Sequence, residues 1–405
     1  MRRVAVIGAG AAGSMAAIFA AESGAETLLL ESTKDGGRKI LISGGGRCNI
    51  LPARVDEARF VTDSSPNILR KIIRSWPLRE QIAFFEDRLR IPLVEETESA
   101  KLFPASHRAR DVRDGLLAHA AEKGVQLLME TTVTGILPSG TRWRIERMPG
   151  AALEVDAVVV ATGGLSVPNT GSTGFGLTAA KRLGHTLHPT YAALTPLTAS
   201  PPPFASLAGV SLTVGLAARD GERSAQAVGG FLFTHEGYSG PSVLDVSHVA
   251  VRSLVSNGPH AHILVGWSPY GDAEWETALR PHGVRTVAGA LRAVMPERLA
   301  LALLAVANVD PSRTLAELRR DERLRLIDAL VRGVLPWTGD AGYRKAEVTG
   351  GGVSLAEIDP RTMESRKCAG LYLCGEVLDA FGPIGGYNFL WAWATGRAAG
   401  LGAAR

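Results

Sequence analysis

The stretch that decides the fold is Val4-Ala-Val-Ile-Gly-Ala-Gly-Ala-Ala-Gly13, near the start of the chain. Its four leading apolar residues predict a buried strand, Gly13–Ser23 predicts a helix, and Thr27–Glu31 predicts a second strand. The three glycines between the first strand and the helix allow a tight turn, a close backbone approach to a pyrophosphate, and close helix–strand packing. The stretch therefore predicts a βαβ unit that binds a dinucleotide; the alternative is glycines that serve packing alone.

Three further features identify the dinucleotide. Glu31 ends the second strand, where a carboxylate accepts hydrogen bonds from ribose hydroxyls. Asp156–Ala161 predicts a buried strand followed by Thr162-Gly-Gly164, and Gly375-Glu-Val-Leu-Asp379 follows another strand-like segment. Gly385-Gly-Tyr-Asn388 then opens a helix, whose amino terminus would stabilise negative charge on a reduced flavin. Together these turns favour non-covalently bound FAD over NAD.

Composition places the chain among globular proteins. It has 46 glycines in 405 residues, whereas ordinary usage would give roughly 28. The excess clusters at the expected turns without a Gly-X-Y period, which excludes collagen. Apolar residues make up 46% of the chain and charged residues 21%, which excludes a disordered protein and provides a large core. The length predicts two or three domains.

Charge, cysteines and hydropathy indicate a soluble, cytoplasmic protein. The net charge is +4, and basic and acidic residues are interspersed along the chain, so nucleic acid is not the leading partner. Cys48, Cys368 and Cys374 form no C-x-x-C pair, which favours a reducing compartment. The uncharged run Val4–Ala21 superficially resembles a signal peptide, but its glycines and the strand that follows favour a folded unit. No other apolar run is long enough to span a membrane, and nothing indicates the oligomeric state.

The order of the predicted elements indicates a discontinuous domain. We expect an α/β, Rossmann-like FAD-binding domain over 1–189 and 346–405, because the opening pattern returns at the end of the chain. An inserted β-rich domain is expected over 190–271 and 336–345. The Ala/Leu/Arg-rich stretch 272–335 has helical spacing and predicts a helical subdomain.

The most unusual segment is Arg38-Lys-Ile-Leu-Ile-Ser-Gly-Gly-Gly-Arg-Cys-Asn49. Consecutive glycines let a chain pass close to a flat ligand, and Arg47 and Asn49 add a cation and an amide. This segment resembles the signature of the BaiN-type, or aminoacetone oxidase-like, family of NAD(P)/FAD-dependent oxidoreductases. The resemblance continues in order along the chain, through Leu102-Phe-Pro-Ala-Ser106, Gly171-Ser-Thr-Gly174, Phe233-Thr-His-Glu-Gly-Tyr-Ser-Gly-Pro241, Thr349-Gly-Gly-Gly-Val353, Thr362-Met-Glu-Ser365 and the two C-terminal motifs above.

The resemblance implies an FAD domain of the glutathione-reductase superfamily type, with an inserted β-barrel-like domain and a helical piece. It also implies cofactor contacts. With the turn pattern, we assign these contacts to Gly8, Ala9, Gly10, Ala12, Gly13, Glu31, Ser32, Lys39, Ser43, Gly45, Arg47, Asn49, Val133, Ala161, Thr162, Gly163, Gly164, Gly375, Glu376, Asp379, Gly385, Gly386, Tyr387, Asn388 and Phe389.

Two departures from the family pattern lie beside the expected flavin. Ile50-Leu-Pro52 follows Asn49 where relatives usually continue toward Thr-Asn, and Ala380–Ile384 lacks a second acid that relatives often have. The substrate pocket is therefore expected to differ. Trp391 and Trp393 stand two residues apart on a predicted helix and cannot share a face, so at least one belongs to the core or an interface.

The catalytic acid or base is the least determined element. His235 is a candidate because histidine titrates near neutral pH, with a structural histidine as the alternative. Arg47 is a second candidate, for binding an anionic substrate group, with phosphate or flavin contact as the alternative. The sequence shows no Ser/His/Asp order, metal-ligand cluster or Walker loop, so hydrolase and metal mechanisms are disfavoured.

These features predict an FAD-dependent oxidoreductase that acts on a small organic substrate by hydride transfer at flavin N5. NAD(P)H-driven reduction, with NAD(P)H as a transient donor, is the leading version; an amine oxidase that uses oxygen is the alternative. A flavin-dependent RNA-modifying protein is a further alternative, prompted by the arginines of 313–332. Acidic residues interleave with those arginines, which favours a solvated helix face.

Overall fold

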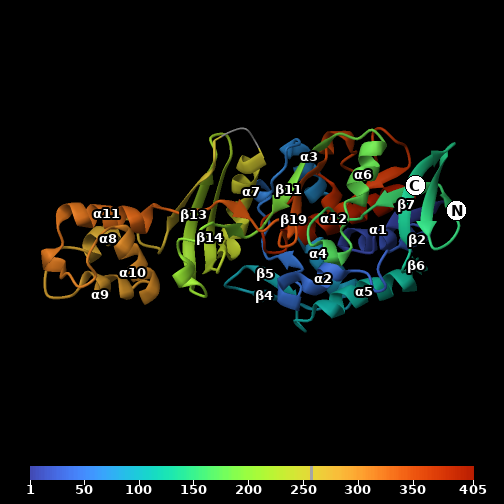
Figure 1. The fold of residues 1–405 in the computed structure, drawn as a ribbon. Helices are drawn as coiled ribbons and strands as arrows, with labels where there is room; N and C mark the ends of the chain where they lie inside the picture. The colour runs from blue at the N-terminus through green and yellow to red at the C-terminus, as the bar shows by residue number, and fades with distance from the viewer. Residues whose placement is uncertain (256–258) are drawn as a thin grey trace. The chain divides into compact units, whose positions relative to one another are not determined.

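The computed structural model describes residues 1–255 and 259–405. The contacts divide the chain into two compact units (Figure 1). Unit 1 comprises Met1–Tyr191 and Glu347–Arg405, and unit 2 comprises Ala192–Ala346. The finer three-part division expected from the sequence stays a prediction.

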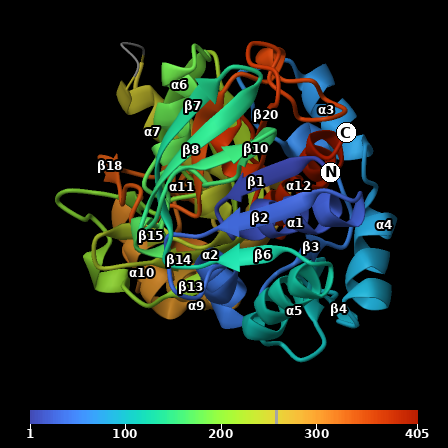
Figure 2. The same ribbon diagram turned by 90° about the vertical axis from the view of Figure 1, so that its right-hand side faces the viewer.

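A five-stranded parallel sheet forms the centre of unit 1. Its order is β20 (Leu371–Leu373), β10 (Ala157–Val160), β1 (Arg3–Ile7), β2 (Glu26–Leu30), β6 (Gln126–Leu128), as Figure 2 shows. Strands β1 and β10 are almost wholly buried, as expected for a parallel sheet covered on both faces. The Rossmann-type α/β fold predicted from the sequence is confirmed.

Helices and smaller sheets surround this sheet. Two three-stranded antiparallel sheets and the pair β11–β19 complete the unit. The remaining elements of unit 1 are α1 (Ala11–Glu22), α2 (Arg38–Ile42), α3 (Pro66–Arg74), α4 (Leu78–Ala83), α5 (Ala109–Glu122), α6 (Phe175–Arg182), α12 (Tyr387–Ala403), β3 (Leu51–Pro52), β4 (Leu93–Glu96), β5 (Lys101–Pro104), β7 (Thr132–Ser139), β8 (Arg142–Met148), β9 (Leu153–Val155), β11 (Leu187–Ala193) and β19 (Val348–Val353).

Helices α1 and α12 pack against each other at very short range. A Cβ on Gly396 would lie 2.3 Å from the carbonyl oxygen of Ala12, and one on Gly400 would lie 2.3 Å from that of Ala16. Real Cβ atoms do not approach backbone so closely, so only glycine permits this helix crossing. Because α12 is buried on most sides, it positions the loops on either side of it.

Unit 2 contains a seven-stranded antiparallel sheet and a group of helices. Helix α7 packs on β13 and β14, and α8–α11 follow β16 in the sequence. The β-barrel-like form implied by the resemblance stays a prediction. The elements are β12 (Leu197–Thr198), β13 (Ser211–Arg219), β14 (Ser224–Phe233), β15 (Gly237–Ser239), α7 (Pro241–Val255), β16 (His262–Gly266), α8 (Asp272–Ala278), α9 (Val287–Arg292), α10 (Glu297–Val306), α11 (Arg320–Val331), β17 (Gly333–Val334) and β18 (Gly339–Asp340), in the sheet order β17-β16-β13-β14-β15-β12-β18.

The structure corrects three local predictions. Residues 66–90, whose sequence predicts a helix, are divided between α3 and α4 at Pro77, whose ring and missing N–H prevent a continuous helix. Residues 36–49, whose glycines, serine and arginines predict a loop, contain α2 and a short 3₁₀ turn. The inserted domain, expected to be β-rich, contains α7, whose five valines have a high β-propensity. None of the described helices is long and apolar enough to cross a membrane.

Candidate functional site

The glycine turn after β1 has the geometry that the sequence predicts. Gly8 adopts a φ of +101°, which glycine tolerates and other residues rarely adopt. A Cβ on Gly13 would lie 1.8 Å from the carbonyl oxygen of Gly8, so the third glycine is required for the turn to close. A Cβ on Gly10, by contrast, would meet no protein atom within 4 Å. Open space therefore adjoins the start of α1, which begins at Ala11 and includes Ala12.

Glu31 supports this turn from the end of β2. Its Oε2 accepts the N–H of Ala9 at 2.8 Å, and its Oε1 accepts the N–H and the hydroxyl of Thr33 at 2.8 and 2.7 Å. The hydroxyl of Ser32 lies 3.4 Å from the same Oε1. The carboxylate thus fixes the backbone of the turn, and its contact with a ribose stays a prediction.

The strand ends of β10 and β20 are joined by a charged network. Lys39 donates to the hydroxyl of Ser166 and to Glu376 Oε2, both at 2.5 Å. Ser166 donates to Glu376 Oε1 at 2.5 Å, and the N–H of Thr349 donates to the same oxygen at 2.9 Å. The side chain of Glu376 is 16% exposed and that of Lys39 is 30% exposed. Two predicted cofactor residues far apart in the sequence therefore meet here.

The residues after β10 lie between this network and the first turn. Ala161 continues the sheet, its N–H donating to Ile7 O at 2.9 Å. A Cβ on Gly8 would lie 2.6 Å from the carbonyl oxygen of Ala161, and one on Gly164 would lie 2.4 Å from Thr349 Oγ1. Gly163 has a φ of +70°. The predicted second turn is thus packed directly on the first.

Segment 43–49 forms a compact turn beside these loops. Ser43 donates to Ile40 O at 2.6 Å, and Gly44 and Gly45 both have positive φ. A Cβ on Gly45 would meet nothing within 4 Å. Cys48 is buried, and burial raises the pKa of its thiol to about 12, so this cysteine is not a nucleophile at neutral pH.

Two buried polar atoms in these loops have no protein partner. They are Oδ1 of Asn49 and Oγ1 of Thr162. An unsatisfied buried polar atom is unfavourable, and its presence indicates a missing ligand or water. Both residues were assigned to the cofactor from the sequence. The orphaned atoms and the open space at Gly10 and Gly45 fit a bound dinucleotide with a flat ring system.

Arg47 is held by its neighbours in the antiparallel sheet. Its guanidinium lies 4.3 Å from the ring centroid of Phe103 and donates to Glu96 Oε1 at 3.0 Å. Hydrogen bonds from Ser99 and then Arg47 lower the pKa of Glu96. These contacts give Arg47 a structural role, and a contact with substrate or flavin stays a prediction.

Asp379 lies in the turn after β20, with a side chain that is 3% exposed. Its Oδ2 accepts the N–H groups of Asp63 and Ser64 at 3.0 and 2.8 Å. It also accepts the hydroxyls of Thr62 at 3.0 Å and Ser64 at 2.7 Å. The carboxylate therefore anchors the loop before α3. Nothing in the sequence marks Thr62 or Ser64 as its partners.

The start of α12 is fixed by side chains that bond to nearby backbone. Asn388 Oδ1 accepts the N–H of Gly382 at 2.9 Å, and Asn388 Nδ2 donates to Gly382 O at 3.0 Å. The amide therefore fixes the backbone of the preceding loop. The hydroxyl of Tyr387 donates to Arg54 O at 3.3 Å. A Cβ on Gly386 would lie 2.3 Å from the carbonyl carbon of Leu51. Two further predicted residues complete the region: Gly385, with a φ of +108°, and Phe389, whose ring stacks on Trp393.

Trp391 and Trp393 are both buried, which confirms that at least one belongs to the core. Trp391 donates to Gly375 O and Trp393 to Ile50 O, each at 3.1 Å. The two indoles therefore fix the two loops that flank the predicted flavin. Val133, the remaining predicted contact, is buried in β7 next to a bulge.

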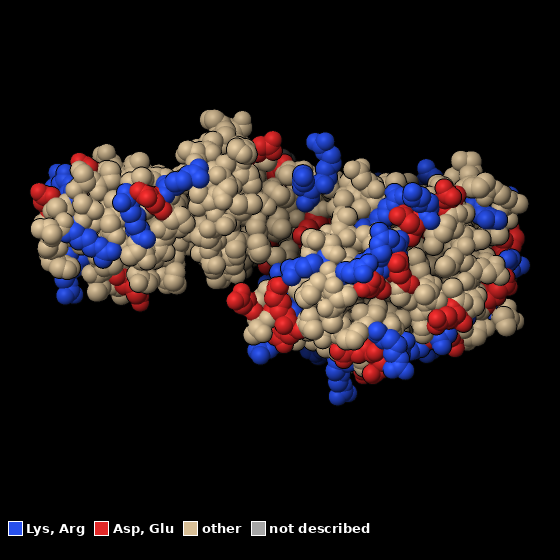
Figure 3. Space-filling model, turned by 90° about the horizontal axis from the view of Figure 1, so that it is seen from below, with Lys and Arg blue, Asp and Glu red and all other residues tan. Residues whose placement is uncertain are grey.

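His235 and the arginine-rich helices belong to unit 2. His235 is exposed in the turn between β14 and β15. Arg325 pairs with Asp321 at 2.9 Å, and Arg332 pairs with Asp272 at 2.8 Å. Acidic and basic side chains alternate over α8–α11, as Figure 3 shows. This is the solvated helix face that the interleaved charges predict.

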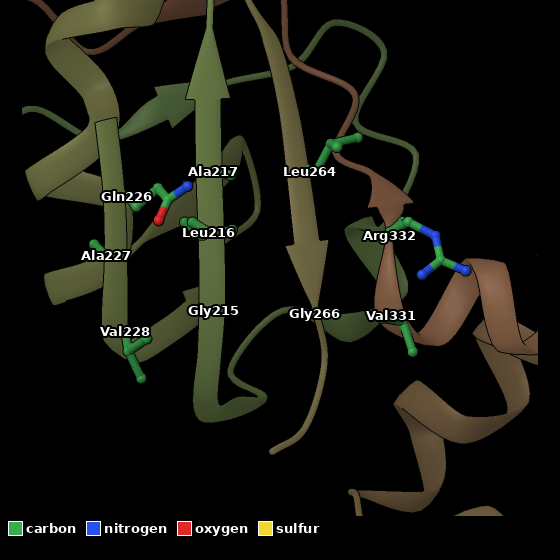
Figure 4. A pocket seen from close by; sticks show the side chains of 10 residues that line it. All are labelled: Gly215, Leu216, Ala217, Gln226, Ala227, Val228, Leu264, Gly266, Val331 and Arg332. Carbon is green, nitrogen blue, oxygen red and sulfur yellow. The ribbon is translucent and has the colours of Figure 1, made fainter. Parts of the chain in front are cut away.

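A shallow groove of about 440 Å³ lies on the sheet of unit 2. Small residues such as Gly215, Ala217 and Gly266 line it, together with Val228 and Leu264 (Figure 4). None of the residues assigned to the site from sequence lines this groove. Among the described residues, no group of three or more His, Cys, Asp or Glu side chains could hold a metal ion.

Comparison with known proteins agrees with the geometry. The profile of the family described as "HI0933-like protein Rossmann domain" matches residues 2–402. The chain is 32% identical to a 3-dehydro-bile acid delta(4,6)-reductase of Clostridium scindens, over 100% of this chain and 99% of the relative. It is also 32% identical to a ribosomal RNA dihydrouridine synthase of Escherichia coli, over 96% and 95%.

Solved structures show the same fold at lower identity. The 3-ketosteroid delta1-dehydrogenase of Sterolibacterium denitrificans superposes with a TM-score of 0.53 at 13% identity, covering 100% of both chains.

Proposed function

Because the chain belongs to the HI0933-like family of Rossmann-domain proteins and is an FAD-binding oxidoreductase, we propose that it reduces a carbon–carbon double bond conjugated to a carbonyl group. Its substrate is a small organic molecule, and NAD(P)H supplies the electrons. The observation that carries the proposal is the bond chemistry shared by its full-length relatives.

The names of two relatives describe the same change at different molecules. A 3-dehydro-bile acid delta(4,6)-reductase removes double bonds conjugated to a 3-oxo group. A dihydrouridine synthase produces the saturated C5–C6 bond next to a uracil carbonyl. In both cases a polarised double bond gains one hydride and one proton, which is chemistry that a reduced flavin performs.

The residues of unit 1 support such a cofactor. Gly8, Gly10 and Gly13 provide the phosphate turn, and the open space at Gly10 admits the pyrophosphate. Asn49 Oδ1 and Thr162 Oγ1 offer unsatisfied acceptors to a hydrogen-bonding ring or ribityl chain. The bound flavin supplies the hydride, and the chain orients the substrate and supplies the proton.

The test separates electron donation from electron acceptance. The FAD-loaded protein is mixed with NADPH under anaerobic conditions, and the loss of the flavin absorption band at about 450 nm is followed. The reduced protein is then mixed with 2-cyclohexenone, a 3-oxo-4-ene steroid, or a saturated ketone as the matched control. Reoxidation by the conjugated probes alone supports the proposal. Reoxidation by oxygen but by neither conjugated probe would contradict it and favour the oxidase alternative.

Ribosomal RNA is the second candidate substrate, because one relative is a ribosomal RNA dihydrouridine synthase and the match covers 95% of that protein. The paired arginines of α11 offer few uncompensated charges for a phosphate backbone. Incubation of the NADPH-reduced protein with unmodified ribosomal RNA, followed by nucleoside mass spectrometry, decides this case. Dihydrouridine formed at one position with a rate above that for free uridine would establish RNA as the substrate.

A further inference from the structure

Ser64, His188 and Asp379 form a cluster in unit 1 that includes one predicted cofactor contact, Asp379. Ser64 precedes α3, His188 lies in β11, and Asp379 follows β20. Nε2 of His188 lies 3.3 Å from Ser64 Oγ and 3.6 Å from Asp379 Oδ2. Three segments far apart in the sequence thus meet at one imidazole nitrogen.

The hydrogen bonds of Ser64 determine which nitrogen of the imidazole carries hydrogen. Its hydroxyl donates to Asp379 Oδ2 at 2.7 Å, and its oxygen accepts the N–H of Leu355 at 3.0 Å. A serine hydroxyl has one proton and two lone pairs, so only one lone pair remains for His188. Nε2 therefore carries a hydrogen, and Nδ1 is the nitrogen that Ser64 does not engage.

The imidazole of His188 lies between a buried carboxylate and solvent. The side chain of His188 is 25% exposed, whereas that of Asp379 is 3% exposed. The carboxylate lies on the Nε2 side of the imidazole, and part of the His188 side chain is open to water. This is the arrangement of a histidine oriented by a carboxylate, here through a serine.

The cluster lies near the strand ends at which α/β proteins bind ligands. Asp379 follows Glu376 in the turn after β20, and Glu376 bonds Lys39 and Ser166 after β10. Ligands of open parallel sheets bind outside the carboxyl ends of the strands. The imidazole therefore adjoins the region in which the substrate of a bound flavin is expected.

We propose that His188 is the proton donor of the reduction, with Ser64 as the residue that positions it. The inference rests on the proposed function. When a hydride reaches one carbon of the conjugated double bond, the other carbon takes the proton from Nδ1 of the imidazolium. His188 is left neutral with hydrogen on Nε2, still bonded to Ser64, and regains its proton from water.

The first experiment uses His188→Gln in the FAD-loaded protein, with His282→Gln on an exposed residue of unit 2 as the control. The glutamine amide retains a hydrogen-bond donor toward Ser64 but cannot exchange a proton. We expect normal FAD content and normal reduction by dithionite. Reoxidation by 2-cyclohexenone should slow by roughly 100-fold or more, in line with the usual contribution of general acid catalysis. A reoxidation rate of His188→Gln within about threefold of the unsubstituted protein would overturn the proposal. So would a slowing of roughly 100-fold in His235→Gln but not in His188→Gln.

The second experiment does not depend on turnover. Nitrogen NMR of the protein labelled at histidine distinguishes the two neutral tautomers of His188. We expect hydrogen on Nε2, and a loss of that preference in Ser64→Ala. Hydrogen on Nδ1 in the unsubstituted protein would overturn the inference. If 2-cyclohexenone and the 3-oxo-4-ene steroid both fail to reoxidise the protein, the proposed function fails, and the tautomer still decides the position of the proton.

Discussion

Units 1 and 2 use charged side chains in different ways. In unit 1, Lys39 and Glu376 are mostly shielded from water and share hydrogen bonds with Ser166. In unit 2, Arg332 and Asp272 form an exposed pair, with side chains that are 46% and 58% exposed. The Lys39–Glu376 pair is therefore a part of the folded interior of unit 1, whereas the Arg332–Asp272 pair of unit 2 faces solvent. The difference shows that the two pairs make different energetic demands, because a shielded charge depends on its partner more than an exposed one does.

The largest expected effect comes from a pair of matched glycines. A Cβ on Gly10 in unit 1 or on Gly215 in unit 2 would meet no protein atom within 4 Å. We expect Gly10→Ala to weaken FAD binding by roughly 100-fold, or about 2.7 kcal/mol, because its methyl group enters the space of the pyrophosphate. Gly215→Ala should leave FAD binding unchanged. Fluorescence titration of the two apoproteins with FAD measures this difference. Equal affinities for FAD would contradict the assignment of this turn to the pyrophosphate.

A second pair of substitutions compares the charges directly. Lys39→Met leaves Glu376 without its cation in a partly buried site, and we expect a loss of about 1–3 kcal/mol in the free energy of unfolding. Arg332→Met removes an exposed cation, and we expect a loss within about 1 kcal/mol. Chemical denaturation of both variants tests the contrast. Equal losses would show that the two networks are energetically alike.

The smallest expected effect is a dependence of unit 1 on pH. His185 lies 3.0 Å from Glu357 and bonds Ser365, and burial lowers the pKa of its imidazole. Burial raises the pKa of Glu357, but hydrogen bonds from Lys367 and Thr186 outweigh this and lower it to about 2.

At pH values between the ordinary pKa values of glutamate and histidine, His185 therefore binds a proton more readily in the unfolded chain than in the folded chain. Stability is then highest above about pH 6.5 and falls as the pH is lowered. Denaturation at a series of pH values should show a shallower fall for His185→Gln than for the unsubstituted protein. A stability that rises on acidification would contradict the buried neutral imidazole.

Local patterns predicted the central fold because the strands at the centre of the main sheet carry short runs of apolar residues. Val4–Ile7 and the valines of 157–160 are buried strands in the structure, as their composition indicates. Helix α7 was missed because its valines have a high β-propensity, although Val243, Val246 and Val249 recur at the three-residue spacing of a helix face.

The candidate site shows the same division between local and long-range information. The glycines at positions 8, 10 and 13 are recognisable because their spacing reflects a local turn. The partners of Asp379 are not, because Thr62 and Ser64 lie more than 300 residues away and belong to no motif. His188 follows the same rule, since its importance depends on hydrogen bonds formed only after three distant segments meet.

The tight crossing of α1 and α12 has a consequence for biosynthesis. Helix α1 emerges from the ribosome early, yet the helix whose glycines fit against its carbonyls begins only at Tyr387. Until then, the apolar surface of α1 lacks its permanent cover, and the intervening chain, including all of unit 2, is already synthesised. The face of α1 that α12 covers is therefore completed last, although α1 already has its contacts with β1, β2 and α5, and unit 2 has time to fold before the dinucleotide-binding unit is complete.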